Sequence, residues 1–474
     1  MPKSKKFSYK HVVNYFSGVT EFKGLELEES TARYIADRLN RMHELEERMN
    51  ELLMHYGATD SPIKVRIGPE LEFYNIAGEQ SFSNRLRQLA RANDADDLGA
   101  IFEARLAKDD SFMPRAAQLP SLDAAFRTKL RLEHRVRVKQ EPAYNTQIAT
   151  ERCFSLDGME STISRIALFQ HEIVSPPRNP YGLGVWLSTI GQRIIDRAPD
   201  YGLKRAEIIT SLHDMSSSSL HFHISLAAGR GGETINLMQR DAFSNERGRR
   251  QRNPAEPSQL ALHIAHAMNE VLKDYIYILA PTDDAYERFS DRHFVGTSFI
   301  GFSPRKARFH MGSAMFRGEG RETFRVEDPG GTPDEGALRI ELRAADVGCI
   351  GHPNKRAYRD QLMAPFDVTE TLMYILYKGV ENWAGDRAAE LQGHKVAIKS
   401  EEGLYEQRFK LPPRAGTAAT YLKSAQKRGD GFLTPSRAEI ITARGLRQQE
   451  INGLDHKPNL PRGQHHDRTP YLSP

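Results

Sequence analysis

Three short stretches of the chain place side chains that bind metal ions or phosphate two residues apart, within runs that favour β-strands. Alternate residues of a strand face the same side, so each stretch should present its polar side chains on one surface and its apolar ones on the other. The stretches are GPELEFY at residues 68–74, LHFHISL at 220–226 and RIELR at 339–343. Their polar members are Glu70 with Glu72, His221 with His223, and Arg339 with Glu341 and Arg343.

These side-chain types indicate a site for metal ions and phosphate. Burying part of a carboxylate or an imidazole costs free energy unless a hydrogen-bond partner or a ligand binds the polar group. Hard divalent cations such as Mg²⁺ and Mn²⁺ take carboxylate oxygens first, and Mn²⁺ also accepts an imidazole nitrogen. Arginines on the same face would hold phosphate oxygens in a planar, bidentate manner. The combination predicts phosphoryl transfer from a nucleotide, with two cations on one face of a sheet.

Periodic patterns of apolar residues predict the elements that must hold these side chains. Alternation predicts a strand over residues 62–75, a hairpin over 135–154 and several strands within 297–345. Spacings of three and four residues predict helices, whereas the chain beyond Asn452 has no periodicity and is expected to be irregular. The predicted helices cover residues 27–56, 81–92, 96–108, 159–173, 183–197, 258–279 and 355–380.

The helix predicted over residues 27–56 carries a narrow apolar stripe that includes Ile35, Leu39 and Leu53. Such a stripe could dock on the helix's own domain or form the seam between two copies of the chain. The sequence leaves both alternatives open.

The composition is that of a globular protein without a strongly charged partner. The 474 residues are 39% hydrophobic, enough for a sizeable core, and 66 basic against 62 acidic residues leave a formal net charge of only +4. This balance gives no support for a nucleic-acid or membrane partner. Two cysteines, Cys153 and Cys349, are too few for a disulfide framework. No apolar stretch of 18 residues occurs, so we expect a cytoplasmic protein that is neither exported nor membrane-spanning.

Five motifs, in chain order from residue 68 to residue 346, resemble those of the catalytic domain of glutamine synthetase and related carboxylate-amine ligases. GPELEF at 68–73 resembles the family's metal-binding E-x-E strand, and LHFHISL at 220–226 resembles its M-H-x-H-x-S-L strand. PTDDAYER at 281–288 is similar to P-T-x-x-S-Y-K-R, FSPR at 302–305 to the nucleotide segment S-A-R, and RIELRAAD at 339–346 to R-I-E-x-R-x-x-D.

The resemblance implies metal ligands. Glu72 would bind a first metal ion, and a second ion nearer the nucleotide would be bound by Glu70, His221 and Glu341.

The first metal ion has two further glutamates in the family, on a hairpin, and two segments could supply them. In QEPAYNTQ at residues 140–147, Glu141 keeps a ligand while Gln147 replaces the second carboxylate with a weaker neutral group. The competing alignment uses His171 and Glu172 in HEIV at residues 171–174.

The resemblance also implies phosphate and substrate contacts. Arg288 would approach the carboxylate substrate or its acyl phosphate, and Arg288 and Arg343 are the predicted catalytic residues. The nucleotide phosphates would be contacted by His223, Arg305, Arg339 and Arg343.

Three departures from the family pattern stand out, and the first two concern the substrates. The family's N-G-S-G run, which helps to hold glutamate, is SSSS at residues 216–219, where Ser216 and Ser217 are candidate substrate contacts. The glutamate that binds and deprotonates ammonium falls at Phe294, which argues for an acceptor other than ammonia. Asp291 or His293 could serve as a replacement base. A long helix also stands where the family has an N-terminal β-grasp domain.

We therefore expect an α+β fold, with a curved, mainly antiparallel sheet of the glutamine synthetase and guanidino kinase type and helices packed outside it. The predicted units are an N-terminal helical region at 1–60, the catalytic domain at 61–400 and a partly irregular C-terminal extension at 401–474. The resemblance implies an ATP-dependent ligase that forms an amide, with a γ-glutamyl product favoured, through an acyl phosphate.

The expected cofactors and partners follow from this activity. They are ATP, two or more Mg²⁺ or Mn²⁺ ions, a small carboxylate and an amine, with a homo-oligomer as the expected assembly. Two alternatives stay open, a phosphotransferase of the same fold and a catalytically degenerate scaffold protein.

Overall fold

Nine strands in the described part of the chain form one open sheet, and every pairing between them is antiparallel. The order along the sheet is β2-β3-β4-β1-β6-β9-β8, while β5 pairs with β1 and β7 with β6. The strands are β1 Lys64–Ile76, β2 Thr150–Phe154, β3 Glu160–Ala167, β4 Gln170–Val174, β5 Arg205–Glu207, β6 Leu220–Arg230, β7 Glu233–Asn236, β8 Ala314–Arg317 and β9 Arg339–Ala344.

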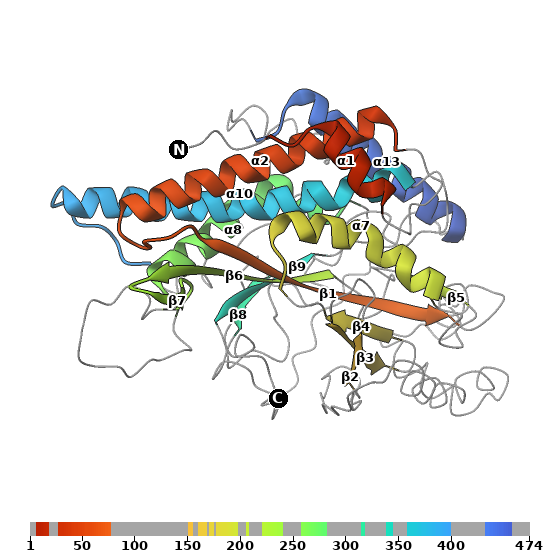
Figure 1. The fold of residues 1–474 in the computed structure, drawn as a ribbon, viewed down its shortest axis with the longest axis horizontal. Helices are drawn as coiled ribbons and strands as arrows, with labels where there is room; N and C mark the ends of the chain where they lie inside the picture. Colours follow the sequence, from red (N-terminus) through yellow and green to blue (C-terminus); the bar gives the residue numbers. More distant parts are fainter. Residues whose placement is uncertain are drawn as a thin grey trace, which may run out of the picture.

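The helices lie together on one side of this sheet (Figure 1). They are α1 Tyr9–Ser17, α2 Glu29–His55, α7 Pro180–Arg197, α8 Gln259–Leu279, α10 Tyr358–Leu391 and α13 Pro435–His456. The computed structural model describes residues 6–18, 27–76, 150–154, 160–167, 170–174, 177–197, 205–207, 220–239, 257–281, 314–317, 338–344, 358–399 and 432–456. The predicted fold class, α+β with a mainly antiparallel sheet and helices outside it, is confirmed.

The central strands bury one face against the helices because their apolar residues alternate with polar ones. On β1 the apolar members are Val65, Ile67 and Leu71, all at most 2% exposed. The same alternation continues on the neighbouring strands with Leu220, Phe222, Ile224 and Leu226 of β6 and Ile340 and Leu342 of β9. These side chains belong to one hydrophobic core with α2, α8 and α10. The opposite face of the same strands is left to the polar residues.

Helices α8 and α10 form the centre of the helical layer and approach each other closely. The side chain of Ser258 caps α8 by accepting a hydrogen bond from the backbone N–H of Ala261 at 3.0 Å. A Cβ atom at Gly379 of α10 would come within 2.4 Å of the Ile264 Cα on α8, so only glycine fits there. The two helices thereby form a rigid support behind the strands.

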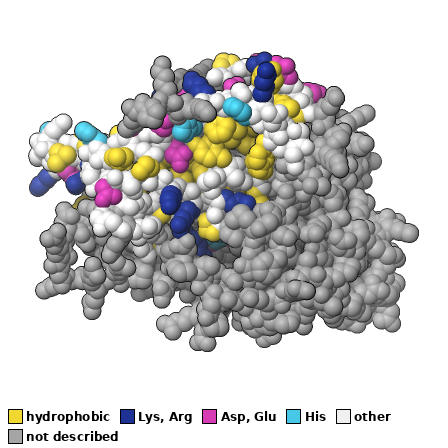
Figure 2. Space-filling view, viewed as in Figure 1, with side chains coloured by type: hydrophobic (Ala, Val, Ile, Leu, Met, Phe, Trp, Pro, Cys, Tyr) yellow, Lys and Arg dark blue, Asp and Glu magenta, His cyan; other side chains and the backbone are white. Residues whose placement is uncertain are grey.

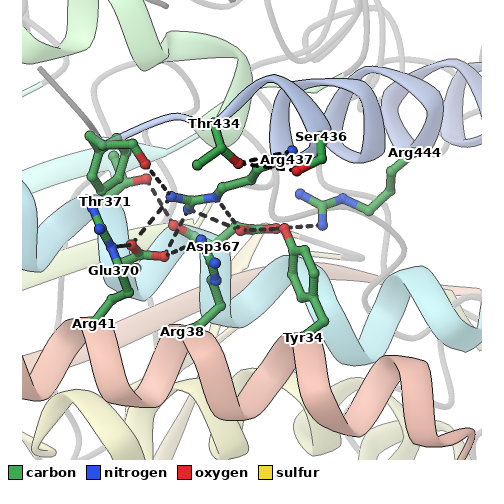
Figure 3. Close-up of polar contacts among 11 residues, drawn as sticks. Tyr34, Arg38, Arg41, Asp367, Glu370, Thr371, Thr434, Ser436, Arg437 and Arg444 are labelled. Carbon is green, nitrogen blue, oxygen red and sulfur yellow. Dashed lines mark hydrogen bonds and ion pairs between the residues drawn. The ribbon is translucent and has the colours of Figure 1, made fainter. Parts of the chain in front are cut away.

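A buried cluster of charged residues joins α2, α10 and α13 (Figure 3). Asp367 and Glu370 of α10 are fully buried, and Arg437 of α13 lies between them with N···O distances of 3.0 Å and 2.9 Å. Asp367 also accepts hydrogen bonds from the Tyr34 hydroxyl at 2.8 Å and from Arg444 at 2.6 Å. Two further arginines of α2, Arg38 and Arg41, contact Glu370. Helices α2 and α13 are therefore held to α10 by charge pairs.

The cluster predicts a specific loss of stability in acid. Burial alone would raise the pKa of Asp367, but attraction to Arg444, Arg437 and Arg38 outweighs it and lowers the pKa below its ordinary value. The carboxylate therefore contributes stability that is complete above its unfolded pKa of about 3.9 and is lost as the pH falls through the folded pKa.

Denaturant unfolding between pH 6 and pH 2.5 measures this loss. Below about pH 4, the free energy of unfolding should fall less in Asp367→Asn than in the wild type. Identical pH profiles would contradict this, and Glu29→Gln, in an exposed ion pair, is the control.

Figure 2 shows hydrophobic side chains of the helical layer reaching the surface among charged ones. Among the described residues, the most exposed large hydrophobic side chains belong to several separate elements, and they are Tyr15, Met54, Leu391, Ile398 and Leu446. Scattered residues of this kind are usual on protein surfaces. None of the described helices is both long enough and apolar enough to span a bilayer.

The helix predicted over residues 159–173 is wrong, because this segment forms the paired strands β3 and β4. Its apolar residues recur at three- and four-residue steps, which imitates a helix. Many of them are β-branched, however, and such side chains favour strands. Ile163 and Ile173 lie directly opposite each other across the two strands. As a consequence, Glu172 lies in the sheet, on β4.

Other predicted elements are largely confirmed. The helix expected at 27–56 is α2, and its apolar stripe packs into the core of the same chain, as the docking alternative required. The helices at 183–197 and 258–279 and the strand at 62–75 are α7, α8 and β1. The last predicted helix extends further, as α10, to Leu391.

Helix α13 was not predicted, and it runs four residues past Asn452, where an irregular tail was expected. The predicted helices at 81–92 and 96–108, and the hairpin before residue 150, lie outside the described residues. The division at residues 60 and 400 into three units stays a prediction.

Candidate metal and phosphate site

Strand pairing brings the predicted site residues into two adjacent rows on the polar face of the sheet. In the first row, Glu70 of β1 lies opposite His221 of β6, which lies opposite Arg343 of β9. In the next row, His223 of β6 lies opposite Glu341 of β9. Directly opposed residues share a face, so motifs more than 100 residues apart meet here.

The described side chains of these rows contact one another. The Nε2 atom of His223 lies 2.7 Å from Oε2 of Glu70. The Nδ1 atom of His221 lies 3.6 Å from the same oxygen and 3.7 Å from Oε1 of Glu341. On the far side of His223, Nε of Arg339 donates a hydrogen bond to Nδ1 at 3.1 Å. Two carboxylates, two imidazoles and one guanidinium therefore form a continuous polar cluster.

Three members of this cluster are buried, while His223 and Arg339 are partly exposed. Glu70, His221 and Glu341 are 8%, 6% and 2% exposed. Burial alone would raise the pKa of Glu70, but the neighbouring imidazoles of His221 and His223 outweigh it and hold the pKa well below its usual range. Glu70 is thus an anion at neutral pH, ready to bind a cation or a donor.

Glu70, His221 and Glu341 are of the side-chain types that a divalent cation takes as ligands. Two ligand atoms bound to the same ion at about 2.1 Å are about 3 Å apart when adjacent and about 4.2 Å apart when opposite. His221 lies 3.6 Å and 3.7 Å from the two carboxylates, which is longer than the spacing of adjacent ligands. Among the described residues, no three His, Cys, Asp or Glu side chains already converge in a complete metal-binding arrangement. A cation bound here would therefore have to draw these three side chains closer together.

Some predicted site residues are placed by the backbone alone. Glu72 lies in β1 two residues after Glu70, and Arg343 lies in β9 two residues after Glu341, both on the polar face. The remaining predicted site residues lie outside the described part of the chain, and they are Glu141, Ser216, Ser217, Arg288 and Arg305. Their roles stay predictions.

Two further residues share this face in the register of the sheet. Glu172 of β4 lies opposite Glu72, the position that the competing alignment requires for a ligand of the first metal ion. Arg317 of β8 lies opposite Arg339, and sequence reasoning missed it. Directly opposed like charges destabilise a sheet unless something neutralises them. No local pattern marks Arg317, because its neighbours Met315 and Phe316 are both apolar and only the strand register places it opposite Arg339.

Comparison with known proteins yields matches among solved structures only. No protein-family model matches the sequence, and no curated protein does. The structure of a novel glutamine synthase homologue matches with a TM-score of 0.43 and 14% identity, over 86% of this chain and 71% of that chain. GmaS in its ADP complex matches with a TM-score of 0.42 and 14% identity, over 90% and 76% of the two chains.

The glutamine synthetase of Plasmodium falciparum matches with a TM-score of 0.40 and 12% identity, over 88% of this chain and 77% of that chain. At these identities and TM-scores the likeness transfers no residue role to this chain.

Proposed function

We propose that this chain is an ATP-dependent carboxylate-amine ligase that forms an amide bond through an acyl phosphate. The favoured acid is glutamate, activated at its γ-carboxylate, and the acceptor is an amine other than ammonia. The observation that supports this most is the largely buried cluster on the polar face of the sheet. It joins two carboxylates and two imidazoles to an arginine, and its members are Glu70, His221, His223, Glu341 and Arg339.

A purely structural role explains this cluster poorly. Burying charged groups costs several kcal/mol unless pairing or ligands compensate, and apolar residues would fill the space at lower cost. The sheet already has an apolar face that packs against the helices. A cation and an anionic ligand that bind to the other face of the sheet explain the charged residues there better than a structural role does.

The proposed reaction has two steps. An oxygen of the substrate carboxylate attacks the γ-phosphorus of ATP, and the bond to ADP breaks. The amine nitrogen then attacks the acyl carbon, phosphate leaves with the bonding electrons, and the amine gives up a proton. Bound divalent cations would neutralise charge on the phosphates.

Each residue of the site has a proposed part in this reaction. Glu70, His221 and Glu341 hold one cation through two oxygens and a nitrogen. Arg339 and Arg343, with His223, orient the phosphate groups, because guanidinium groups fit phosphate oxygens in bidentate fashion. Arg317 joins this set, because it lies opposite Arg339 in the sheet and a guanidinium group suits phosphate oxygens. Arg288 approaches the carboxylate substrate.

For the first cation we propose that Glu172 serves beside Glu72. The two residues lie opposite each other on β4 and β1, so both lie on the polar face. Glu172→Gln is therefore expected to weaken Mn²⁺ binding about 10–100-fold. Calorimetric titration of the apo protein with Mn²⁺ measures this directly.

Glu151→Gln is the matched control for this test. Glu151 lies on β2 opposite Ile163, which places it on the other face of the sheet. Loss of affinity in Glu141→Gln together with normal binding in Glu172→Gln would refute our choice and favour the alignment at residues 140–147.

We propose the same cellular setting, assembly and domain division that the sequence predicts. They are a cytoplasmic homo-oligomer with small-molecule substrates, no nucleic-acid or membrane partner, and the three units with boundaries near residues 60 and 400.

The proposed reaction is tested by a substrate screen. The purified chain, with ATP and Mg²⁺ or Mn²⁺, is offered glutamate and related acids together with a panel of amines, and ADP and phosphate are measured. We expect release that depends on both acid and amine, and mass spectrometry should detect the amide. A phosphorylated product without free phosphate would instead indicate a phosphotransferase, and no ADP in any mixture would favour a scaffold protein.

A further inference from the structure

We infer that Arg339 and His223 form a positioning relay that aims the Glu70 carboxylate at the cation. Arg339 acts through His223 and need not touch the cation itself. This inference rests on the proposed metal site and adds to it a role that the strand motifs do not assign. It concerns the state of the chain before any nucleotide binds.

The relay is a chain of two hydrogen bonds across three strands. Arg339 lies on β9, His223 on β6 and Glu70 on β1. Nε of Arg339 donates to Nδ1 of His223 at 3.1 Å, and Nε2 of His223 lies 2.7 Å from Oε2 of Glu70. The two ring nitrogens thus connect a guanidinium on one side with a carboxylate on the other.

The chemistry of arginine fixes the tautomer of His223. A guanidinium has only donors, so Nδ1 of His223 must accept and cannot carry a proton. The proton of the neutral ring then sits on Nε2, from which it is donated to Glu70. Without Arg339, both tautomers of the ring would become accessible, and one of them cannot donate to Glu70.

The donated hydrogen bond restricts how Glu70 can bind a cation. Among the described side chains, both polar contacts of Glu70 are to Oε2, from His223 and from His221. His223 anchors this oxygen, which is also the one nearest His221, and so fixes the rotation of the carboxylate beside the proposed cation position. Partners of this kind around a metal ligand raise metal affinity 10–100-fold by holding the ligand in place.

The first test reads the tautomer of His223 in the apo protein, without metal or nucleotide. Nitrogen-15 NMR of the labelled histidine rings at pH 8 distinguishes protonated from bare ring nitrogens, and the His223→Gln variant identifies the His223 signals. We expect a bare Nδ1 and a protonated Nε2 in the wild type. In Arg339→Met we expect a mixture of the two tautomers.

The second test measures Mn²⁺ affinity of the same apo proteins. Glutamine offers one acceptor and one donor at nearly the spacing of the two ring nitrogens, so His223→Gln should stay within about 3-fold of the wild type. His223→Met and Arg339→Met, which lose the relay, should bind Mn²⁺ about 10–100-fold more weakly. Arg339→Lys keeps a charge and a donor and should fall between them.

Arg317→Met is the matched control, because it removes an arginine from the position opposite Arg339. It should weaken nucleotide binding but leave the His223 tautomer unchanged. A protonated Nδ1 in the wild type would overturn the relay, and so would an unchanged tautomer and Mn²⁺ affinity in Arg339→Met. If the wild type binds no Mn²⁺, the proposed metal site fails, while the NMR result still decides whether the relay exists.

Discussion

Replacing Glu341 by glutamine is expected to reduce ATP-dependent ligation about 10³-fold, more than the 10–100-fold typical of residues that only support a metal ligand. Glu341 is 2% exposed, and its Oε1 lies 3.7 Å from Nδ1 of His221. Glutamine keeps the shape of the side chain but removes the negative charge that the cation needs. The measurement is ADP release with the best acid and amine pair, together with calorimetric Mn²⁺ binding.

The controls for this variant separate the chemistry from the fold. Glu270→Gln changes an exposed glutamate of α8 and should leave activity and Mn²⁺ affinity unchanged. Thermal unfolding should show that Glu341→Gln is folded. Full activity in Glu341→Gln would remove this residue from the site and with it the proposed cation position.

The second large effect concerns stability. Asp367→Ala is expected to lower the free energy of unfolding by about 3–5 kcal/mol, because it leaves buried arginines without their counter-charge. Asp367 is fully buried and contacts Arg437 at 3.0 Å, Arg444 at 2.6 Å and the Tyr34 hydroxyl at 2.8 Å. Denaturant unfolding measures the loss, and Glu29→Gln in an exposed pair should change stability by less than about 1 kcal/mol.

A double-mutant cycle sharpens this prediction. Arg444 contacts Asp367 directly, so adding Arg444→Met to Asp367→Ala should recover part of the loss by removing an uncompensated charge. Strictly additive losses would show that the two side chains do not interact. A small loss in Asp367→Ala would show that α13 is not held by this cluster.

The sequence predicted an element correctly where the spacing of its own apolar residues also decides which face of that element is buried. The alternation of polar and apolar residues in β1, β6 and β9 made both the strands and their shared polar face predictable. The long stripe of α2 likewise predicted a helix. In each case, the periodicity reflects one buried face and one exposed or functional face.

Elsewhere the decisive partners are distant in the chain, and no local pattern reveals them. Arg437 and Asp367 are 70 residues apart, and Tyr34 and Asp367 are 333 residues apart. Each looks like an ordinary surface residue of a helix until the helices pack. Arg317 and Glu172 gained their positions from strand register, which the spacing of their own segments cannot supply. The β3–β4 pair was mistaken for a helix for the same reason, since Ile163 meets Ile173 across strands.

The central claim is that the polar face of the sheet binds a nucleotide together with divalent cations. Calorimetric titration with a non-hydrolysable ATP analogue, with and without Mn²⁺, tests it most directly in the wild type and in Glu72→Ala. We predict binding that strengthens at least about 10-fold with Mn²⁺ in the wild type and loses this enhancement in Glu72→Ala. Nucleotide binding that is indifferent to Mn²⁺, or no binding in the wild type, would contradict the claim.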